Sequence, residues 1–193
     1  MKKFTLILAI TLITTALFAQ INDRRGYIGI TVGPSIAVGN FSSTSPDNKS
    51  GFAKTGLNIG LVNFGYRLGE NFGLTALWFG AAHKADFDGI DATWSYGGLM
   101  GGGMFTIPID NKFAFDLKAM AGFVSARIDA GDWGDDNGDG AGFDFGASFR
   151  YHFSDRWSVL MTTDFFTSKP DFDGGKQTIS TININAGLAY RFR

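Results

Sequence analysis

Apolar and polar residues alternate along most of this chain, and the alternation is clearest near its end. One parity of residues 182–192 is apolar: Ile182, Ile184, Ala186, Leu188, Tyr190 and Phe192. The other parity is small or polar: Asn183, Asn185, Gly187, Ala189 and Arg191. Alternation with period two predicts a β-strand that has one apolar face. Residues 143–153 carry the same pattern, so two long strands are predicted here.

Six further segments show this alternation, which brings the predicted strands to eight. They are residues 28–39, 55–67, 72–83, 92–106, 113–127 and 157–168. Within 55–67 the apolar parity switches between Leu61 and Val62, which predicts a β-bulge. The strands are about eleven to fifteen residues long, more than a globular sheet needs and suited to a tilted crossing of a bilayer.

The connections between these strands alternate in length. Residues 68–71, 108–112 and 154–156 are short, whereas 41–54, 84–91, 128–140 and 169–177 are longer. Short periplasmic turns and longer external loops are typical of outer-membrane barrels. The pattern therefore predicts an all-β fold, an eight-stranded antiparallel up-and-down transmembrane β-barrel.

The start of the chain differs from the rest. Lys2 and Lys3 precede an apolar run over residues 4–18, which ends near Ala19. This is the arrangement of a cleaved secretory signal peptide, and an uncleaved anchor is the alternative. We expect residues 1–19 to be the signal peptide and residues 20–193 to be the barrel domain.

Composition excludes several classes of protein. The chain has no cysteine, so disulfides and thiolate sites are excluded. Its 17 basic and 18 acidic residues leave no basic patch for nucleic acid. No apolar window of helical membrane length follows the signal peptide, which argues against a helical membrane protein.

A soluble eight-stranded barrel of the lipocalin type would show the same alternation, with its apolar face inward around a ligand. Two features favour the membrane. The polar face is rich in glycine, alanine and serine, which would make a poor solvated exterior, and aromatic residues gather at strand ends, as a girdle at the membrane interface requires. The expected periplasmic girdle is Phe64, Tyr66, Phe72, Phe105, Phe113, Tyr151, Trp157, Tyr190 and Phe192.

The whole mature chain resembles the small outer-membrane β-barrel family, the eight-stranded group related to the OmpA transmembrane domain, OmpX and OmpW. The resemblance is strongest in "YHFSDRWSV" at 151–159 and "NAGLAYRF" at 185–192. Tyr190 and Phe192 are similar to the C-terminal signal read by the barrel-assembly machinery, although here Arg193 follows the last aromatic residue. The resemblance implies a location in the outer membrane of a Gram-negative cell, with lipid, lipopolysaccharide and the assembly machinery as partners.

An eight-stranded barrel is only wide enough to be filled by its own side chains. Seven charged residues are predicted to point inward: Arg67, Asp116, Lys118, Asp144, Arg150, Asp164 and Arg191. Three of these residues are acidic and four are basic. Because buried charges need partners, we predict that they form salt bridges with one another inside the barrel. A narrow proton or ion path is the alternative.

The predicted external loops hold eleven of the 18 acidic residues, which predicts an acidic outer mouth. Within "DWGDDNGDG" at 132–140, Asp135, Asn137 and Asp139 match the opening of an EF-hand calcium loop, but Gly146 stands where that loop needs glutamate. The segment is interpreted first as a glycine-rich turn. The sharper hypothesis is a weak calcium site, joined by Asp132 or by Asp171 and Asp173 of the next loop; no other cofactor is expected.

Catalysis has little support in the sequence. His152 and Ser154 have the His-x-Ser spacing of an outer-membrane lipid A deacylase, but they lie at a predicted periplasmic turn. His83 is interpreted as a solitary histidine at the membrane interface. We therefore expect no enzyme.

The expected function is a monomeric barrel with a structural, membrane-integrity or surface-interaction role. The alternative is an OmpW-like narrow channel or transporter for small hydrophobic solutes. Glycines at 97, 98 and 101–103 would either open the barrel wall laterally or relieve crowding where the sheet curves; the second is favoured.

Overall fold

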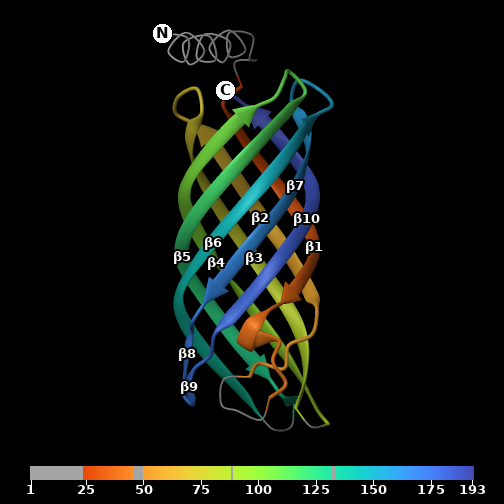
Figure 1. The fold of residues 1–193 in the computed structure, drawn as a ribbon, viewed down its shortest axis with the longest axis vertical. Helices are drawn as coiled ribbons and strands as arrows, with labels where there is room; N and C mark the ends of the chain where they lie inside the picture. The colour runs from red at the N-terminus through yellow and green to blue at the C-terminus, as the bar shows by residue number, and fades with distance from the viewer. Residues whose placement is uncertain (1–23, 46–49, 88, 132–133) are drawn as a thin grey trace, which may run out of the picture.

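The computed structural model describes residues 24–45, 50–87, 89–131 and 134–193. The predicted signal peptide lies outside these ranges, as do Asp47, Asp88 and Asp132. Eight long strands form the fold: β1 (Gly26–Ala37), β2 (Gly56–Arg67), β3 (Phe72–Phe87), β4 (Ile90–Pro108), β5 (Phe113–Asp129), β6 (Asp135–His152), β7 (Trp157–Ser168) and β10 (Ile179–Phe192). Each pairs antiparallel with the next, and β10 pairs with β1. The predicted up-and-down barrel is confirmed (Figure 1).

Besides the eight long strands, the described ranges contain three small elements at the loop end. A single 3₁₀ turn, η1 (Gly39–Phe41), follows β1, and a short hairpin of β8 (Asp171–Phe172) and β9 (Gly175–Lys176) follows β7. No helix of the described ranges is long and apolar enough to cross a membrane.

The barrel has two distinct ends. At the turn end, tight connections join β2 to β3, β4 to β5 and β6 to β7, and the C-terminus lies there (Figure 1). At the loop end lie η1, the hairpin of β8 and β9, and the remaining connections. By the predicted orientation, the turn end faces the periplasm.

Two of the predicted long loops are largely strand. The pairing of β3 with β4 continues to Phe87 and Ile90, and the pairing of β5 with β6 continues to Asp129 and Asp135. Predicted loops 84–91 and 128–140 were therefore wrong over most of their length. Aspartate and glycine have low intrinsic strand propensity. In these segments, however, the backbone hydrogen bonds to the neighbouring strand stabilise the extended conformation, and propensities read from sequence do not include that contribution. These two hairpins extend the wall at the loop end.

The predicted bulge in β2 is confirmed. Between two successive paired positions, β2 contributes one residue more than β1 and one more than β3, at residues 61–62. The extra residue changes which parity faces outward, so Leu57 and Leu61 are exposed before it and Asn63 is buried after it.

The outer face of the barrel is apolar. Large hydrophobic side chains from all eight long strands and their turns point outward with 37 to 71% of their surface exposed. Soluble monomers rarely expose so large a contiguous apolar surface, and charged residues lie inside. The soluble lipocalin-type alternative is therefore rejected, and the exterior has the character of a lipid-facing band.

All nine residues of the predicted girdle contact one another in groups. Phe192 packs against Phe64 and Tyr66, with ring centroids 6.1 and 6.3 Å apart. The other six form three pairs: Phe72 with Phe105, Phe113 with Tyr151, and Trp157 with Tyr190. The aromatic residues thus form a band around the wall toward the turn end.

Candidate functional site: the barrel interior and its ends

Every second residue of each strand points into the barrel, and this places the predicted charged residues there. Six of the seven are buried: Asp116, Lys118, Asp144, Arg150, Asp164 and Arg191. Arg67 is half-buried at the turn end. They do not form one continuous network, because a single ion pair within 4.0 Å joins two of the seven in the described ranges.

That ion pair is between Asp116 of β5 and Arg150 of β6. Arg150 donates from Nε and Nη2 to the two carboxylate oxygens at 2.9 and 2.8 Å. Thr106 donates to the same carboxylate at 2.7 Å, and the guanidinium lies 4.4 Å from the ring centroid of Tyr27. A bidentate pair with further hydrogen bonds and a cation-π contact satisfies both buried charges. This cluster lies in the lumen toward the turn end and joins β4, β5 and β6 to Tyr27 of β1.

A second layer of charge lies in the middle of the barrel. Lys118, Gly146 and Asp164 stand side by side on β5, β6 and β7. A Cβ on Gly146 would overlap the carboxylate of Asp164, so the missing side chain is what lets Asp164 lean toward Lys118. Thr162 donates to Asp164 at 2.8 Å, whereas Oδ1 of the buried Asp144 has no hydrogen-bond partner.

The outer half of the lumen is aromatic. The rings of His83, Tyr96 and Phe166, from β3, β4 and β7, stack with centroid separations of 5.7 and 5.5 Å. Phe79 packs edge-on against Tyr96 and Phe166. The stack therefore crosses the lumen between strands on different sides of the barrel.

His83 is the polar centre of this stack. Its Nε2 lies 3.0 Å from Ser35 Oγ and 3.2 Å from the hydroxyl of Tyr96, and its Nδ1 lies 2.8 Å from the carbonyl oxygen of Lys54. The interpretation of His83 as an interface residue was wrong, since it is buried in the lumen with 1% of its surface exposed. Its position in β3 has inward parity, and the interior supplies it with three partners.

The loop between β1 and β2 closes the mouth above this stack. Phe41 of η1 is fully buried and packs edge-on against His83, Trp94 and Tyr96. The indole of Trp94 donates to the carbonyl oxygen of Gly51 at 2.8 Å, which holds the return limb of the loop inside. The sequence predicts an acidic mouth. In the described ranges this end instead has an acidic exterior around an aromatic plug, because Asp86, Asp91, Asp129, Asp135, Asp139, Asp171 and Asp173 are exposed, and only Asp136 has inward parity, beside Trp94 and Phe172.

The glycines of β4 lie in an unbroken wall. The strand pairs with β3 and with β5 at every position from residue 97 to residue 103. A Cβ on the inward-facing Gly98 or Gly102 would overlap a carbonyl oxygen of β5. The glycines permit close approach of the strands, and no lateral opening exists at this place.

The candidate calcium ligands lie on a strand. Asp135, Asn137 and Asp139 occupy alternate outward positions of β6. The carboxylate of Asp135 forms an ion pair with the guanidinium of Arg127, with 3.1 Å between Oδ2 and Nη2. No group of three or more acidic, histidine or cysteine residues suited to a metal ion occurs in the described part of the chain. The predicted turn is limited to the start of the segment, where the carbonyl oxygen of Gly134 accepts a hydrogen bond from the backbone of Ala130 at 3.0 Å. From Asp135 onward the segment is strand, and calcium binding stays a prediction.

The His-x-Ser spacing does not bring its two residues together. His152 Nδ1 lies 2.7 Å from Ser158 Oγ, while Ser154 Oγ accepts a hydrogen bond from the backbone of Trp157 at 3.0 Å. Ser154 thus caps the tight turn, and His152 pairs with an inward serine of β7.

The assembly-signal residues belong to the aromatic band. Phe192 lies across Gly26 of β1, where any Cβ would overlap its ring, and so reaches the aromatics of β2. Tyr190 packs on Trp157 at 5.4 Å. The last strand is thereby anchored to both of its sides.

The solved structures to which this fold is similar include several small outer-membrane barrels. Neisserial surface protein A aligns with a TM-score of 0.62 at 14% identity, over 86% of this chain and 97% of that chain. The Yersinia pestis attachment invasion locus protein, in complex with the heparin analogue sucrose octasulfate, aligns with a TM-score of 0.52 at 16% identity, over 87% and 99%. Pseudomonas aeruginosa OprG aligns with a TM-score of 0.51 at 14% identity, over 88% and 97%. These likenesses establish the fold.

Comparison with curated protein sequences gives no match. The profile of the outer membrane protein beta-barrel domain, in contrast, matches residues 5–192, nearly the whole chain. Together with the closed eight-stranded wall and its apolar exterior, this match shows that the chain belongs to the outer membrane protein β-barrel domain family.

Proposed function

We propose that this chain is a monomeric, non-conducting outer-membrane barrel with a structural, membrane-integrity or surface-interaction role. The observation that carries the proposal is the filling of the lumen at two levels. The ring stack of His83, Tyr96 and Phe166 closes the outer half, and the pair of Asp116 and Arg150 closes the turn half. A path for ions or solutes would require both to separate.

The alternative, a narrow transporter of hydrophobic solutes, is less well supported. The outer lumen is lined by apolar side chains, as a transporter would need, but they pack on one another and leave their surfaces buried. The wall of β4 is hydrogen-bonded on both sides, so a lateral exit would break ladder pairs. We therefore place transport second.

At the loop end, the proposed surface role rests on outward side chains of both signs. Asp86 pairs with Lys54 at 3.6 Å and Asp171 with Lys176 at 3.5 Å. We propose that the remaining aspartates there contact lipopolysaccharide through divalent cations, and that the barrel-assembly machinery reads the terminal aromatics. Catalysis forms no part of the proposed role.

The test is the conductance of residues 20–193, refolded in detergent and inserted into a planar bilayer, with and without calcium. We expect a folded barrel without discrete openings. Stable openings in the wild-type protein would overturn the proposal and promote the transporter, and block by calcium would place the conducting path near the aspartates of the loop end.

A further inference from the structure

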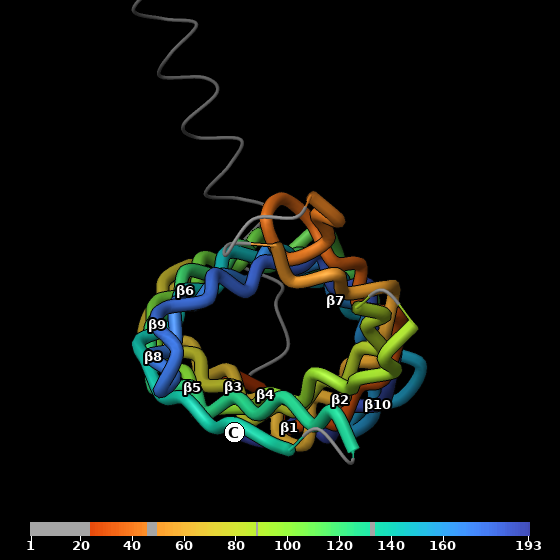
Figure 2. The backbone as a smooth tube through the Cα atoms, turned by 90° about the horizontal axis from the view of Figure 1, so that it is seen from below, coloured from red at the N-terminus to blue at the C-terminus, as the bar shows by residue number. Residues whose placement is uncertain are grey.

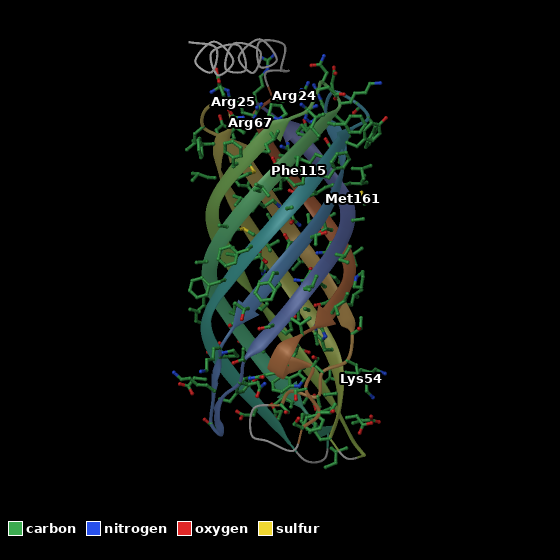
Figure 3. The ribbon with its side chains drawn as sticks, in the orientation of Figure 1. Arg24, Arg25, Lys54, Arg67, Phe115 and Met161 are labelled. Carbon is green, nitrogen blue, oxygen red and sulfur yellow. The ribbon has the colours of Figure 1, made fainter. Side chains whose placement is uncertain are left out.

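The turn end of the lumen is a pocket with basic walls. Arg24, Arg67, Arg150 and Arg191 line it together with His152, and they come from four separate places in the chain. Arg24 precedes β1, Arg67 is the last residue of β2, Arg150 lies in β6, and Arg191 is the residue before the last of β10. Figure 3 shows Arg24 and Arg67 at this end. The closed sheet brings these side chains together, although no local motif contains them.

The basic charges of this pocket are poorly compensated. Arg150 is neutralised by Asp116, but no ion pair within 4.0 Å reaches Arg24, Arg67 or Arg191 in the described ranges. Arg67 and Arg24 donate instead to backbone carbonyl oxygens, at 3.2 and 3.5 Å for Arg67 and 3.3 Å for Arg24. Three guanidinium groups near one another without a carboxylate partner favour an anion.

Arg191 is the most deeply placed of these unpaired cations, with 5% of its residue surface exposed. Burial of a cation without a counter-charge is unfavourable, and a bound anion would relieve that cost. Guanidinium groups match the geometry of phosphate oxygens and donate two parallel hydrogen bonds to them. The chemistry therefore favours a phosphate-type oxyanion.

The shape of the pocket agrees with a ligand that enters from outside. The inner pocket measures about 20 Å³, which is room for one water-sized group. It shares Asn111, His152 and Arg191 with an open depression of about 430 Å³, whose walls also include Lys112. The centre of a phosphate group would lie in the depression and direct one oxygen inward.

Two acidic residues line the same walls. Asp110 lies at the inner pocket, where its Oδ1 accepts hydrogen bonds from the backbone of Lys112 and Phe113 at 2.6 and 2.7 Å. Asp155 lies at the outer depression and is exposed. Asp110 is thus hydrogen-bonded within its own turn, and Asp155 faces solvent. Neither neutralises the arginines, so the wall of the inner pocket keeps its positive charge.

We propose that this end of the barrel binds a phosphate-type oxyanion: Arg191, which lines both cavities, would hold the phosphate, and Arg67 and Arg24 would donate to the oxygen that points into the inner pocket. The phosphate belongs either to the headgroup of an anionic phospholipid of the adjacent leaflet or to free phosphate. In both cases the site is independent of conduction, because the pair of Asp116 and Arg150 separates it from the rest of the lumen.

The first arm of the test uses the refolded mature chain in phospholipid-free micelles, titrated with inorganic phosphate and followed by the NMR shifts of arginine Nε–H groups. We expect saturable shifts at Arg67 and Arg191. Arg191→Gln and, separately, Arg67→Gln should each weaken binding by about tenfold, the loss typical of one charge-assisted pair. Arg25→Gln, which removes an exposed arginine near the same end but outside the pocket walls, should weaken it by less than about threefold.

The second arm uses nanodiscs of phosphatidylglycerol or phosphatidylcholine, and counts the phospholipids that remain on the released barrel by native mass spectrometry. Retention of one phosphatidylglycerol, lost in Arg67→Gln, assigns the site to a lipid headgroup; phosphate binding without retention assigns it to free phosphate. Folding of each variant is checked by heat-modifiable migration. Failure of both ligands to bind the folded wild type, or equal weakening by Arg25→Gln, would overturn the proposal.

Discussion

Arg150 and Asp116 form the one ion pair inside the described barrel that joins two fully enclosed charges, at 2.8 Å. Removing one partner leaves the other charge uncompensated in a dry interior, which typically costs about 3–5 kcal/mol. We expect Asp116→Ala to lower the free energy of unfolding by that amount in a urea titration of the refolded barrel.

An exposed pair provides the control for this prediction. Lys54 and Asp86 lie 3.6 Å apart, and each side chain is about half exposed or more, at 63% and 46%. Lys54→Ala, which removes this pair but keeps the hydrogen bond from Gly89 to Asp86, should therefore cost no more than about 1 kcal/mol. Equal effects of the two substitutions would mean that the interior at Asp116 is hydrated.

Gly146 and Gly103 are both strand glycines, but substitution by alanine should affect them with opposite sign. At Gly146 a methyl group would displace the carboxylate of Asp164, and we expect a loss of about 1–3 kcal/mol, as in overpacked cores. At Gly103, which faces outward with nothing within 4 Å, alanine should raise stability by about 0.5–1 kcal/mol through reduced freedom of the unfolded chain. Urea titrations of the two variants measure both effects, and a stabilising Gly146→Ala would contradict the packing described.

Phe41→Ala should release the loop between β1 and β2 without opening the whole lumen. The variant loses the contacts with His83, Trp94 and Tyr96, whereas the ring stack below remains. We expect faster hydrogen exchange of the Trp94 indole N–H, which is bonded to Gly51, and no conductance. Phe145→Ala, at a lipid-facing position, serves as the control and should leave that exchange unchanged.

Phe192→Ala separates packing from recognition by the assembly machinery. In cells we expect a reduced fraction of folded barrel, seen by heat-modifiable migration of membrane extracts. In detergent, where no machinery is present, refolding should succeed with a smaller loss, limited to the contacts with Phe64 and Tyr66. An equal defect in both settings would show that the ring acts through packing alone.

Calcium should act on the loop end without a discrete site. Asp135 is already paired with Arg127, and the three candidate ligands project at alternate positions of one strand. Any calcium-dependent stability should therefore be reproduced by magnesium and be insensitive to Asp139→Ala in thermal unfolding. A calcium-specific shift that Asp139→Ala abolishes would establish the site instead.

Much of this fold follows from alternation, because a barrel wall separates two environments at every strand. The inward direction of Asp116, Arg150 and Arg191 was predictable for that reason. Their pairing was not, since contacts inside a barrel depend on the stagger of neighbouring strands, which one sequence does not display. The bulge at residues 61–62 was predictable because it changes the parity itself.

The aromatic plug left little signal in the sequence. Phe41 is a single apolar residue among the small and polar residues of a loop. No alternation of apolar and polar residues surrounds it that would have predicted its burial. Trp94 and Tyr96 share a parity, but the glycines that follow them occupy both faces and obscure which face is inner. The extension of β6 was hidden for another reason, because aspartate and glycine favour turns until a neighbouring strand provides hydrogen bonds.

The buried position of Phe41 also has a consequence for the order in which parts of the barrel fold. Its partners His83 and Tyr96 lie beside Phe166 only after β3, β4 and β7 have taken their places around the ring, a set of contacts far apart in sequence that forms slowly. The loop before β2 therefore enters the barrel at the close of folding. Until then its residues lie outside the wall, at the end of the barrel opposite the tight turns, and the burial of one phenylalanine marks the moment at which the barrel is complete.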